Sequence, residues 1–231
     1  MVECEDAIAT NEIDYRFAVA DGATESYGAR KWARYLATSW VSSTSRGADD
    51  AAYLTGLARV AEHFRSKQPK GEVPWYVTAK AEQGSFAAVL GVAFLSLESG
   101  YGYWEAVSVG DCCLVHLRAD GSKTSFPLED PDQFGSHPSE IGSAIHSHET
   151  LLPFVRRSAS TLLPDDILLL MTDAIAQWYL RYCFPDASAA AEFQSALTDG
   201  REAVAQLIER ERLLGRLRND DVAVLRIRAN S

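Results

Sequence analysis

The stretch FAVADG at residues 17–22 carries four apolar residues directly into a carboxylate and a glycine. Residues 14–20 predict a strand that becomes fully buried at its end, because FAVA leaves no polar side for solvent. Asp21 is therefore delivered to the rim of a buried strand. The same pattern recurs along the chain, and both the fold and the candidate site follow from it.

Other carboxylates share this context at the edges of apolar runs: Glu5 and Asp6, Asp111 after VSVG, Asp173 after ILLLMT, and Asp220 and Asp221 before VAVLRI. Taken singly, each is explained by the preference of Asp for turns and caps. Taken together, converging carboxylates would repel one another and lose hydration unless a cation neutralised them. Hard oxygen ligands without a matching His or Cys set favour Mg²⁺ or Mn²⁺ over zinc.

The apolar periodicity places strands in consecutive runs with helices in pairs between them. Helices are predicted at 24–41, with Thr24 as N-cap, and at 51–66, 174–182, 187–197 and 201–215, with Asp49 and Asp50 capping the second. Strands are predicted at 14–20, 75–81, 85–97, 101–109, 112–118, 122–127, 151–159, 166–172 and 222–228. The polar segment 128–150 is predicted as a long surface loop with one short helix. This order indicates an α+β fold built on antiparallel sheets, in one domain spanning residues 1–231.

Composition excludes several classes of protein. The 231 residues are 47% hydrophobic and 23% charged, and 22 basic against 32 acidic residues give a net charge of −10. This balance argues against a protein that binds nucleic acid through phosphate contacts. The longest apolar run, Phe86–Leu95, is about half as long as a membrane-spanning helix. The N-terminus has no signal-peptide pattern and the four cysteines have no CxxC spacing, so we expect a reduced, cytoplasmic protein with no membrane or nucleic-acid partner.

The ordered motifs resemble those of the metal-dependent Ser/Thr protein phosphatases of the type 2C family. The motifs are ED at 5–6, AVADGA at 18–23, GSFA at 84–87, VGDC at 109–112, DILLLMTD at 166–173 and DDVAV at 220–224. Their order and spacing match over nearly the whole chain. The stretch DGATES at 21–26, followed by Trp32 and Ala33, looks most like a bacterial branch of that family.

The resemblance implies an α-β-β-α sandwich of two antiparallel sheets flanked by helix pairs, with a binuclear Mg²⁺ or Mn²⁺ site at one end. The implied metal ligands are Asp21 as the bridge, the Gly22 carbonyl, Glu5 and Asp6 directly or through water, Asp173 and Asp220 on the other ion, and Asp111 on a third, weaker ion. Asp21, Asp173 and Asp220 would then act in catalysis through a metal-activated water that hydrolyses phosphoserine or phosphothreonine. The implied partners are a phosphorylated protein substrate and a partner Ser/Thr kinase, and a monomer is expected.

The sequence departs from the family pattern at several positions. Met1 stands where the family has a phosphate-binding Arg, Ala174 replaces a Gly, Gln177 replaces an acidic residue, and Phe86 replaces a Thr. The phosphate-binding residue is therefore unassigned, with Arg16 and Arg30 as weak candidates. Two alternatives stay open: a catalytically weak module that binds a phosphoprotein or partner, and a phosphatase of a small phosphorylated metabolite.

The remaining candidates have simpler interpretations. His146 and His148 are interpreted as part of a solvated loop rather than as metal ligands. His63 and His116 are expected to be structural. Cys112 and Cys113 are expected to be core residues, since buried Cys behaves as a small hydrophobe.

Overall fold

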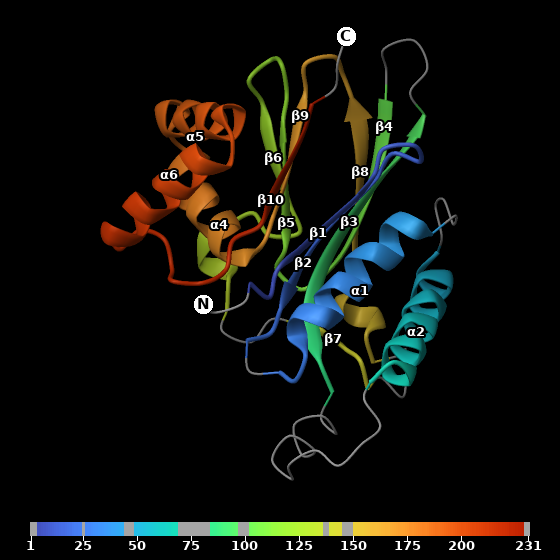
Figure 1. The fold of residues 1–231 in the computed structure, drawn as a ribbon. Helices are drawn as coiled ribbons and strands as arrows, with labels where there is room; N and C mark the ends of the chain where they lie inside the picture. The colour runs from blue at the N-terminus through green and yellow to red at the C-terminus, as the bar shows by residue number, and fades with distance from the viewer. Residues whose placement is uncertain are drawn as a thin grey trace.

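The computed structural model describes residues 4–24, 26–43, 49–68, 84–96, 102–135, 139–144 and 150–228. Within these ranges the chain forms two antiparallel sheets packed face to face, with helices on both outer faces (Figure 1). The sequence pattern predicts an α+β fold built on antiparallel sheets, and the arrangement is the α-β-β-α sandwich that the family resemblance implies. The strand predicted at 75–81, and His146 and His148, lie outside the described residues.

The first sheet has the order β1-β2-β3-β4-β8, with β7 pairing to β3. Its strands are β1 (Ala7–Asn11), β2 (Arg16–Gly22), β3 (Phe86–Ser96), β4 (Gly102–Val109), β7 (Ile141–Gly142) and β8 (Arg156–Leu162). The second sheet has the order β10-β9-β5-β6. Its strands are β5 (Cys113–Leu117), β6 (Lys123–Phe126), β9 (Ile167–Met171) and β10 (Val224–Arg228).

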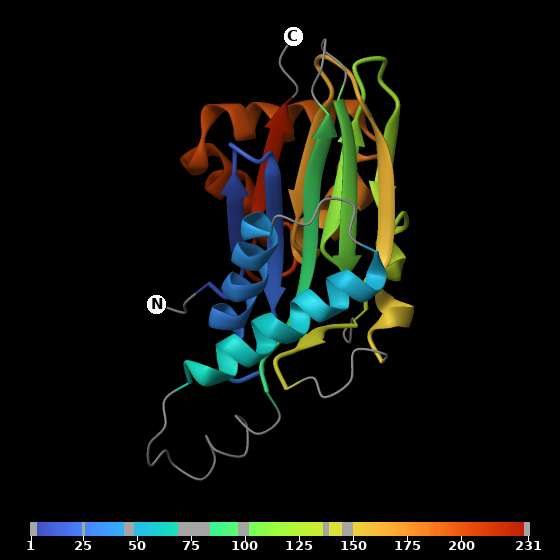
Figure 2. The same cartoon turned by 90° about the vertical axis from the view of Figure 1, so that its right-hand side faces the viewer.

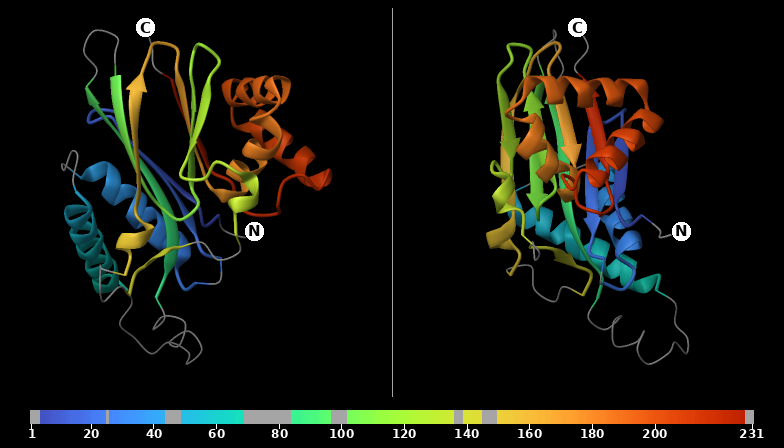
Figure 3. Two further views of the ribbon diagram at one scale, coloured as in Figure 1. Left: turned by 180° about the vertical axis from the view of Figure 1, so that it is seen from behind. Right: turned by 90° about the vertical axis from the view of Figure 1, so that its left-hand side faces the viewer.

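Each sheet carries its own group of helices. Helices α1 (Ala29–Ser42) and α2 (Asp50–Ser66) lie in front of the outer face of the first sheet (Figure 2). Helix α4 (Asp173–Trp178), a π-helical turn (Tyr179–Cys183), α5 (Ala187–Asp199) and α6 (Arg201–Leu213) cover the second sheet (Figure 3). Two 3₁₀ turns, Pro131–Gln133 and Leu152–Phe154, lie in the connections. Among the described residues no helix is both long and apolar enough to span a membrane.

Three buried layers follow from the side-chain periodicity of the strands. In β9, Leu168 and Leu170 pack between the sheets, while Leu169 and Met171 face the helices of the second sheet. Both faces of this strand are buried, which explains its unbroken apolar run. In β2 the same alternation sends Phe17 to the layer between the sheets.

Small residues on the outer face of the first sheet let α1 approach closely. Ala18 and Ala20 of β2 pack beneath it. A Cβ added to Gly91 would lie 2.3 Å from the Trp40 ring, whose Nε1 donates to the Val92 carbonyl at 3.2 Å. Glycine at position 91 is therefore required for this helix–sheet distance.

Most of the predicted elements are confirmed to within a few residues, and the differences have local causes. Helix α1 begins at Ala29 rather than at residue 24, because Gly28 precedes it in the left-handed region (φ 71°), so Thr24 is not its cap. Asp49 does cap α2, with its side chain accepting from Ala52 N.

Two further boundaries were wrong, and two strands were missed. The strand predicted at 151–159 begins only at Arg156, since Leu152–Phe154 forms a 3₁₀ turn around a proline. The helix predicted at 174–182 changes to a π-helical turn at Tyr179. Strand β1, and the two-residue strand β7 within the predicted loop, were not anticipated.

Candidate metal centre

Strand pairing brings the predicted carboxylates to one end of the sandwich. Ala7 of β1 pairs with Ala20 of β2, so Asp6 and Asp21 lie side by side at that end. Met171 at the end of β9 pairs with Cys113 of β5 and with Val224 of β10. Three further carboxylate-bearing segments therefore surround the end of β9: Asp111 before β5, Asp173 after β9, and Asp220 and Asp221 before β10.

A hydrogen-bond relay joins the two sheets at this end. Thr172 Oγ1 donates to Asp6 Oδ2 at 2.8 Å, and Ala223 N donates to Thr172 Oγ1 at 2.9 Å. Asp6, Thr172 and Ala223 are all buried. The relay fixes the Asp6 carboxylate between β1 and the loop before β10.

Asp221 has a positioning role that its place in a motif did not predict. Its Oδ2 accepts from Glu5 N at 2.6 Å, while Asp221 N donates to Asp220 Oδ1 at 2.9 Å. Asp220 itself is exposed. Asp221, rather than Asp220, therefore holds the first acidic segment in place.

Gly22 lies too close to that segment for any side chain. A Cβ at this position would lie 2.9 Å from the Glu5 carbonyl and 3.1 Å from the Ala29 Cβ. The close approach explains why glycine follows Asp21. The predicted role of its carbonyl as a metal ligand stays a prediction.

The carboxylates raise one another's pKa values. Burial, followed by the charges of Asp6, Asp173 and Asp111, raises the pKa of Asp21. Burial also raises the pKa of Asp6, where the charge of Asp221 adds to the effect. Burial raises the pKa of Glu5 as well. Taking several anions out of water together costs free energy unless a cation compensates them.

Asp111 provides the test of whether a metal would fit. It is only 5% exposed, its Oδ2 is buried without a hydrogen-bond partner, and burial with the charge of Asp173 raises its pKa to about 7. Buried carboxylate oxygens are normally satisfied. An oxygen-only donor set of this kind fits a hard divalent cation such as Mg²⁺ or Mn²⁺. Across the described ranges, however, no three His, Cys, Asp or Glu side chains form a closed metal-binding group, so the donors fit in chemistry without forming a ready cage.

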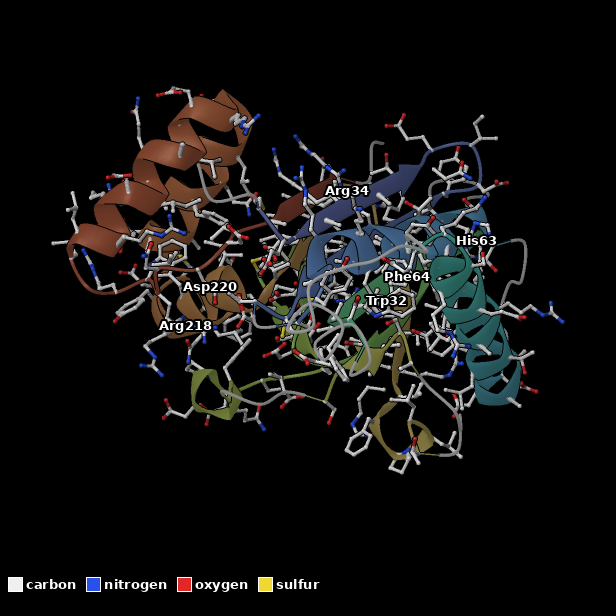
Figure 4. The ribbon with its side chains drawn as sticks, turned by 60° about the horizontal axis from the view of Figure 1, so that its bottom comes forward. Trp32, Arg34, His63, Phe64, Arg218 and Asp220 are labelled. Carbon is white, nitrogen blue, oxygen red and sulfur yellow. The ribbon has the colours of Figure 1, made fainter. Side chains whose placement is uncertain are left out.

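Arg218 enters this group of carboxylates from the loop between α6 and β10. Its Nη2 donates to Asp173 Oδ2, and its charge partly offsets the raised pKa of Asp111. Figure 4, which brings this end of the molecule forward, shows Arg218 and Asp220 close together beside α4 and α6. Sequence reasoning missed Arg218, although it lies only two residues before the predicted ligand Asp220.

Comparison with solved structures identifies the architecture. The catalytic domain of the serine/threonine protein phosphatase PstP, in complex with two manganese ions, aligns over 100% of this chain and 94% of its own, with a TM-score of 0.62 and 16% identity. PppA, a regulatory component of T6SS in Pseudomonas aeruginosa, aligns over 99% and 92% at a TM-score of 0.57 and 19% identity. A phosphatase from Toxoplasma gondii aligns over 99% and 89% at 0.58 and 15%.

The chain has the type 2C phosphatase fold. Comparisons with protein-family models and with curated proteins found no match. At these identities the similarity concerns the fold, and the chemistry of the site has to be argued from the residues of this chain.

The structure gives different outcomes for Arg16 and Arg30, the two weak candidates for a phosphate-binding residue. Arg16 lies at the far end of β2 from Asp21. Its Nε donates to the Trp40 carbonyl at 2.8 Å, and its guanidinium stacks over the Trp40 ring at 4.6 Å. The suggestion that Arg16 binds phosphate was therefore wrong. Arg30, in the first turn of α1, stays an untested candidate.

The other candidates have structural roles, as the sequence predicts. His116 is buried and bonded to Asp166, and His63 stacks on Tyr35 with ring centroids 5.8 Å apart. Cys112 and Cys113 are buried free thiols, as is Cys183, whereas Cys4 is exposed beside the acidic segment. Gln177, which replaces an acidic residue of the family, donates to the Pro131 carbonyl at 3.0 Å.

Proposed function

We propose that the protein is a Mg²⁺- or Mn²⁺-dependent phosphatase that hydrolyses phosphoserine and phosphothreonine in proteins. The observation that carries the proposal is the unpartnered, buried Asp111 Oδ2 within a set of mutually repelling carboxylates at one end of a type 2C fold. The fold of phosphatases such as PstP supports the same conclusion.

The residues that would hold two ions are those the sequence suggests: Glu5, Asp6, Asp21, the Gly22 carbonyl, Asp173 and Asp220, with Asp111 for a third ion. When bound, such ions supply Lewis-acid chemistry, lowering the pKa of a water and neutralising phosphoryl oxygens. The chain's own contribution is positioning. Thr172 orients the Asp6 carboxylate, and Asp221 holds the backbone at Glu5.

The test is a hydrolysis assay on a phosphoserine or phosphothreonine peptide and on an aryl phosphate, with Mn²⁺, with Mg²⁺ and with a chelator. We expect hydrolysis of the peptide only with metal. Asp165→Asn is the matched control, since Asp165 is an exposed carboxylate that pairs with Arg228 at the opposite end of β9. Hydrolysis that persists in the chelator would overturn the proposed metal dependence, and activity on the aryl phosphate alone would favour a small-metabolite phosphatase.

A second candidate is a catalytically weak module that binds a phosphoprotein and regulates it. One observation favours it: Arg218 forms an ion pair with Asp173, one of the predicted metal ligands. Metal-dependent binding of a phosphopeptide without its hydrolysis would support this candidate. The single domain over residues 1–231, the cytoplasmic location, the monomeric state and the partner kinase stay predictions.

A further inference from the structure

The backbone of Arg218 is fixed by several bonds, whereas its partly exposed side chain has one, to Asp173. Arg212 of α6 donates from Nε to the Arg218 carbonyl at 3.3 Å and from Nη2 to the Asp220 carbonyl. Leu217, one residue earlier, is buried in the core of the second sheet, and its N–H donates to the Glu211 carbonyl at 3.2 Å. The Arg218 side chain, by contrast, is 42% exposed. The loop therefore fixes the backbone of Arg218, and the bond to Asp173 holds its partly exposed guanidinium at the acidic end.

The guanidinium keeps hydrogen-bonding capacity after its contact with Asp173. Arginine has five N–H donors in a planar fork that matches two oxygens of a carboxylate or phosphate. Among the described residues, the recorded side-chain bond of Arg218 is from Nη2 to Asp173 Oδ2. Its other nitrogens have no recorded partner there, so they are available to a ligand on the solvent side.

A phosphate group reaching this end of the fold meets a strongly negative surface. Glu5, Asp6, Asp21, Asp111 and Asp173 all lie there. A dianion would be repelled by these carboxylates even where metal ions neutralise part of their charge. The Arg218 guanidinium, beside Asp173, can offset that repulsion and can donate two hydrogen bonds to the oxygens of a phosphoryl group.

We infer that Arg218 binds the phosphoryl oxygens of the substrate, and that its contact with Asp173 is the resting position of the same side chain. Asp173 is also a predicted metal ligand, so a bound divalent cation would compete with the guanidinium for this carboxylate and would leave the guanidinium to the phosphate. This inference rests on the proposed function, because it assumes a phosphate ester as the ligand. It assigns a phosphate-binding residue to a chain that has Met1 at the expected position.

The direct test is calorimetric titration of inorganic phosphate into the full chain, loaded with whichever of Mg²⁺ and Mn²⁺ raises its melting temperature more. Arg218→Gln should weaken phosphate binding about ten- to a hundredfold, as expected for the loss of a charge-assisted contact. Arg218→Lys should recover part of the affinity, because it keeps the charge but not the planar fork. Arg228→Gln is the matched control: it also removes one exposed arginine, but at the opposite end of β10.

Comparing the changes in KM and kcat shows whether Arg218 binds the phosphate or only positions Asp173. On a phosphopeptide, Arg218→Gln should raise KM by a factor similar to the loss of phosphate affinity and change kcat less. If Arg218→Gln instead tightens Mn²⁺ binding and leaves phosphate affinity unchanged, Arg218 is only a counter-ion of Asp173 and the inference is wrong.

The two proposals fail separately. Phosphate binding that depends on Arg218 in a protein that hydrolyses nothing keeps the inference and overturns the proposed function. Metal-dependent hydrolysis with equal phosphate affinity in wild type and Arg218→Gln keeps the proposed function and overturns the inference. A metal-loaded wild type that binds no phosphate overturns the inference whatever the assay shows. Circular dichroism of Arg218→Gln and Arg218→Lys verifies that both variants are folded.

Discussion

Two aspartates lie buried at opposite ends of the second sheet, and their surroundings differ completely. Asp166 precedes β9 and is fully buried; its carboxylate accepts from Leu163 N and Ala119 N, both at 2.9 Å, and bonds to His116 Nε2 at 3.0 Å. Asp111, before β5, is almost as buried, yet its Oδ2 has no partner. The Asp166 carboxylate has its hydrogen-bond partners within the fold, whereas Asp111 Oδ2 lacks one.

The pKa values of the two aspartates record this difference. Burial alone would raise the pKa of Asp166, but the hydrogen bonds from Leu163, Ala119 and His116 outweigh it and lower the pKa. At Asp111 burial prevails and raises the pKa to about 7. Burial by itself therefore does not identify a functional carboxylate in this protein. The missing hydrogen-bond partner of Asp111 Oδ2 is what distinguishes the two aspartates.

The largest effect on stability should come from Asp166→Ala. The substitution leaves the buried His116 and two part-buried backbone N–H groups without their acceptor, so the free energy of unfolding should fall by about 3–5 kcal/mol. Urea denaturation measures it. Asp165→Ala, which breaks only an exposed ion pair with Arg228, should cost under about 1 kcal/mol. Equal losses for the two variants would remove the distinction drawn for Asp166.

At the acidic end of the sandwich, Asp21→Asn in β2 of the first sheet should affect turnover rather than folding. We expect kcat for phosphopeptide to fall at least ~10²-fold, because a charge is lost at the position predicted to bridge two ions. In chelator the variant should melt at or above the wild-type temperature, since one of several repelling charges is gone. If Asp21→Asn keeps the wild-type kcat, Asp21 takes no part in phosphopeptide hydrolysis.

Metal binding should stabilise the wild-type protein by a free energy somewhat smaller than the loss expected for Asp166→Ala. For one site at a metal concentration a hundredfold above Kd, linkage gives about 2.7 kcal/mol, which corresponds to a rise of about 5–10 °C in Tm. Asp21→Asn should show a much smaller rise in differential scanning fluorimetry, whereas Asp165→Asn should match wild type. If all three proteins gain equally from Mn²⁺, the carboxylates at this end form no metal site.

The smallest effect concerns pH and the His116–Asp166 pair. Burial lowers the pKa of His116 and outweighs the hydrogen bond to Asp166. The unfolded chain therefore binds the proton more tightly, and stability is lost as pH falls below about 6.5. The lowered pKa of Asp166 adds a second loss as pH falls below about 4. His116→Gln should remove the first loss in urea titrations at several pH values; an unchanged pH profile would mean that His116 does not cause it.

The sequence was sufficient to place the acidic site because strand ends are encoded locally. The apolar runs before Asp21 and Asp173 set where β2 and β9 stop. The packing of the two sheets brings those ends together, and the bond from Thr172 to Asp6 joins them. The start of α1 was misplaced because it depends on Gly28 adopting a left-handed conformation, which a helical periodicity does not reveal.

Contacts between distant segments could not be predicted in the same way. The bond between His116 and Asp166 joins residues 50 positions apart, through the pairing of β5 with β9. The pair of Arg218 with Asp173 spans 45 positions and depends on a loop that Arg212 shapes. Asp221 appeared as the second half of a motif, and only the fold shows that it holds Glu5.

Of the four cysteines, only Cys4 is an exposed residue, and it lies in the segment that carries Glu5 and Asp6. The natural sequence thus contains a unique attachment point for a reporter group beside the acidic end of the sandwich. A fluorophore or spin label could be coupled there without introducing or removing any cysteine. Its spectrum would follow the arrival of a cation or a phosphate group directly, in real time and independently of any turnover.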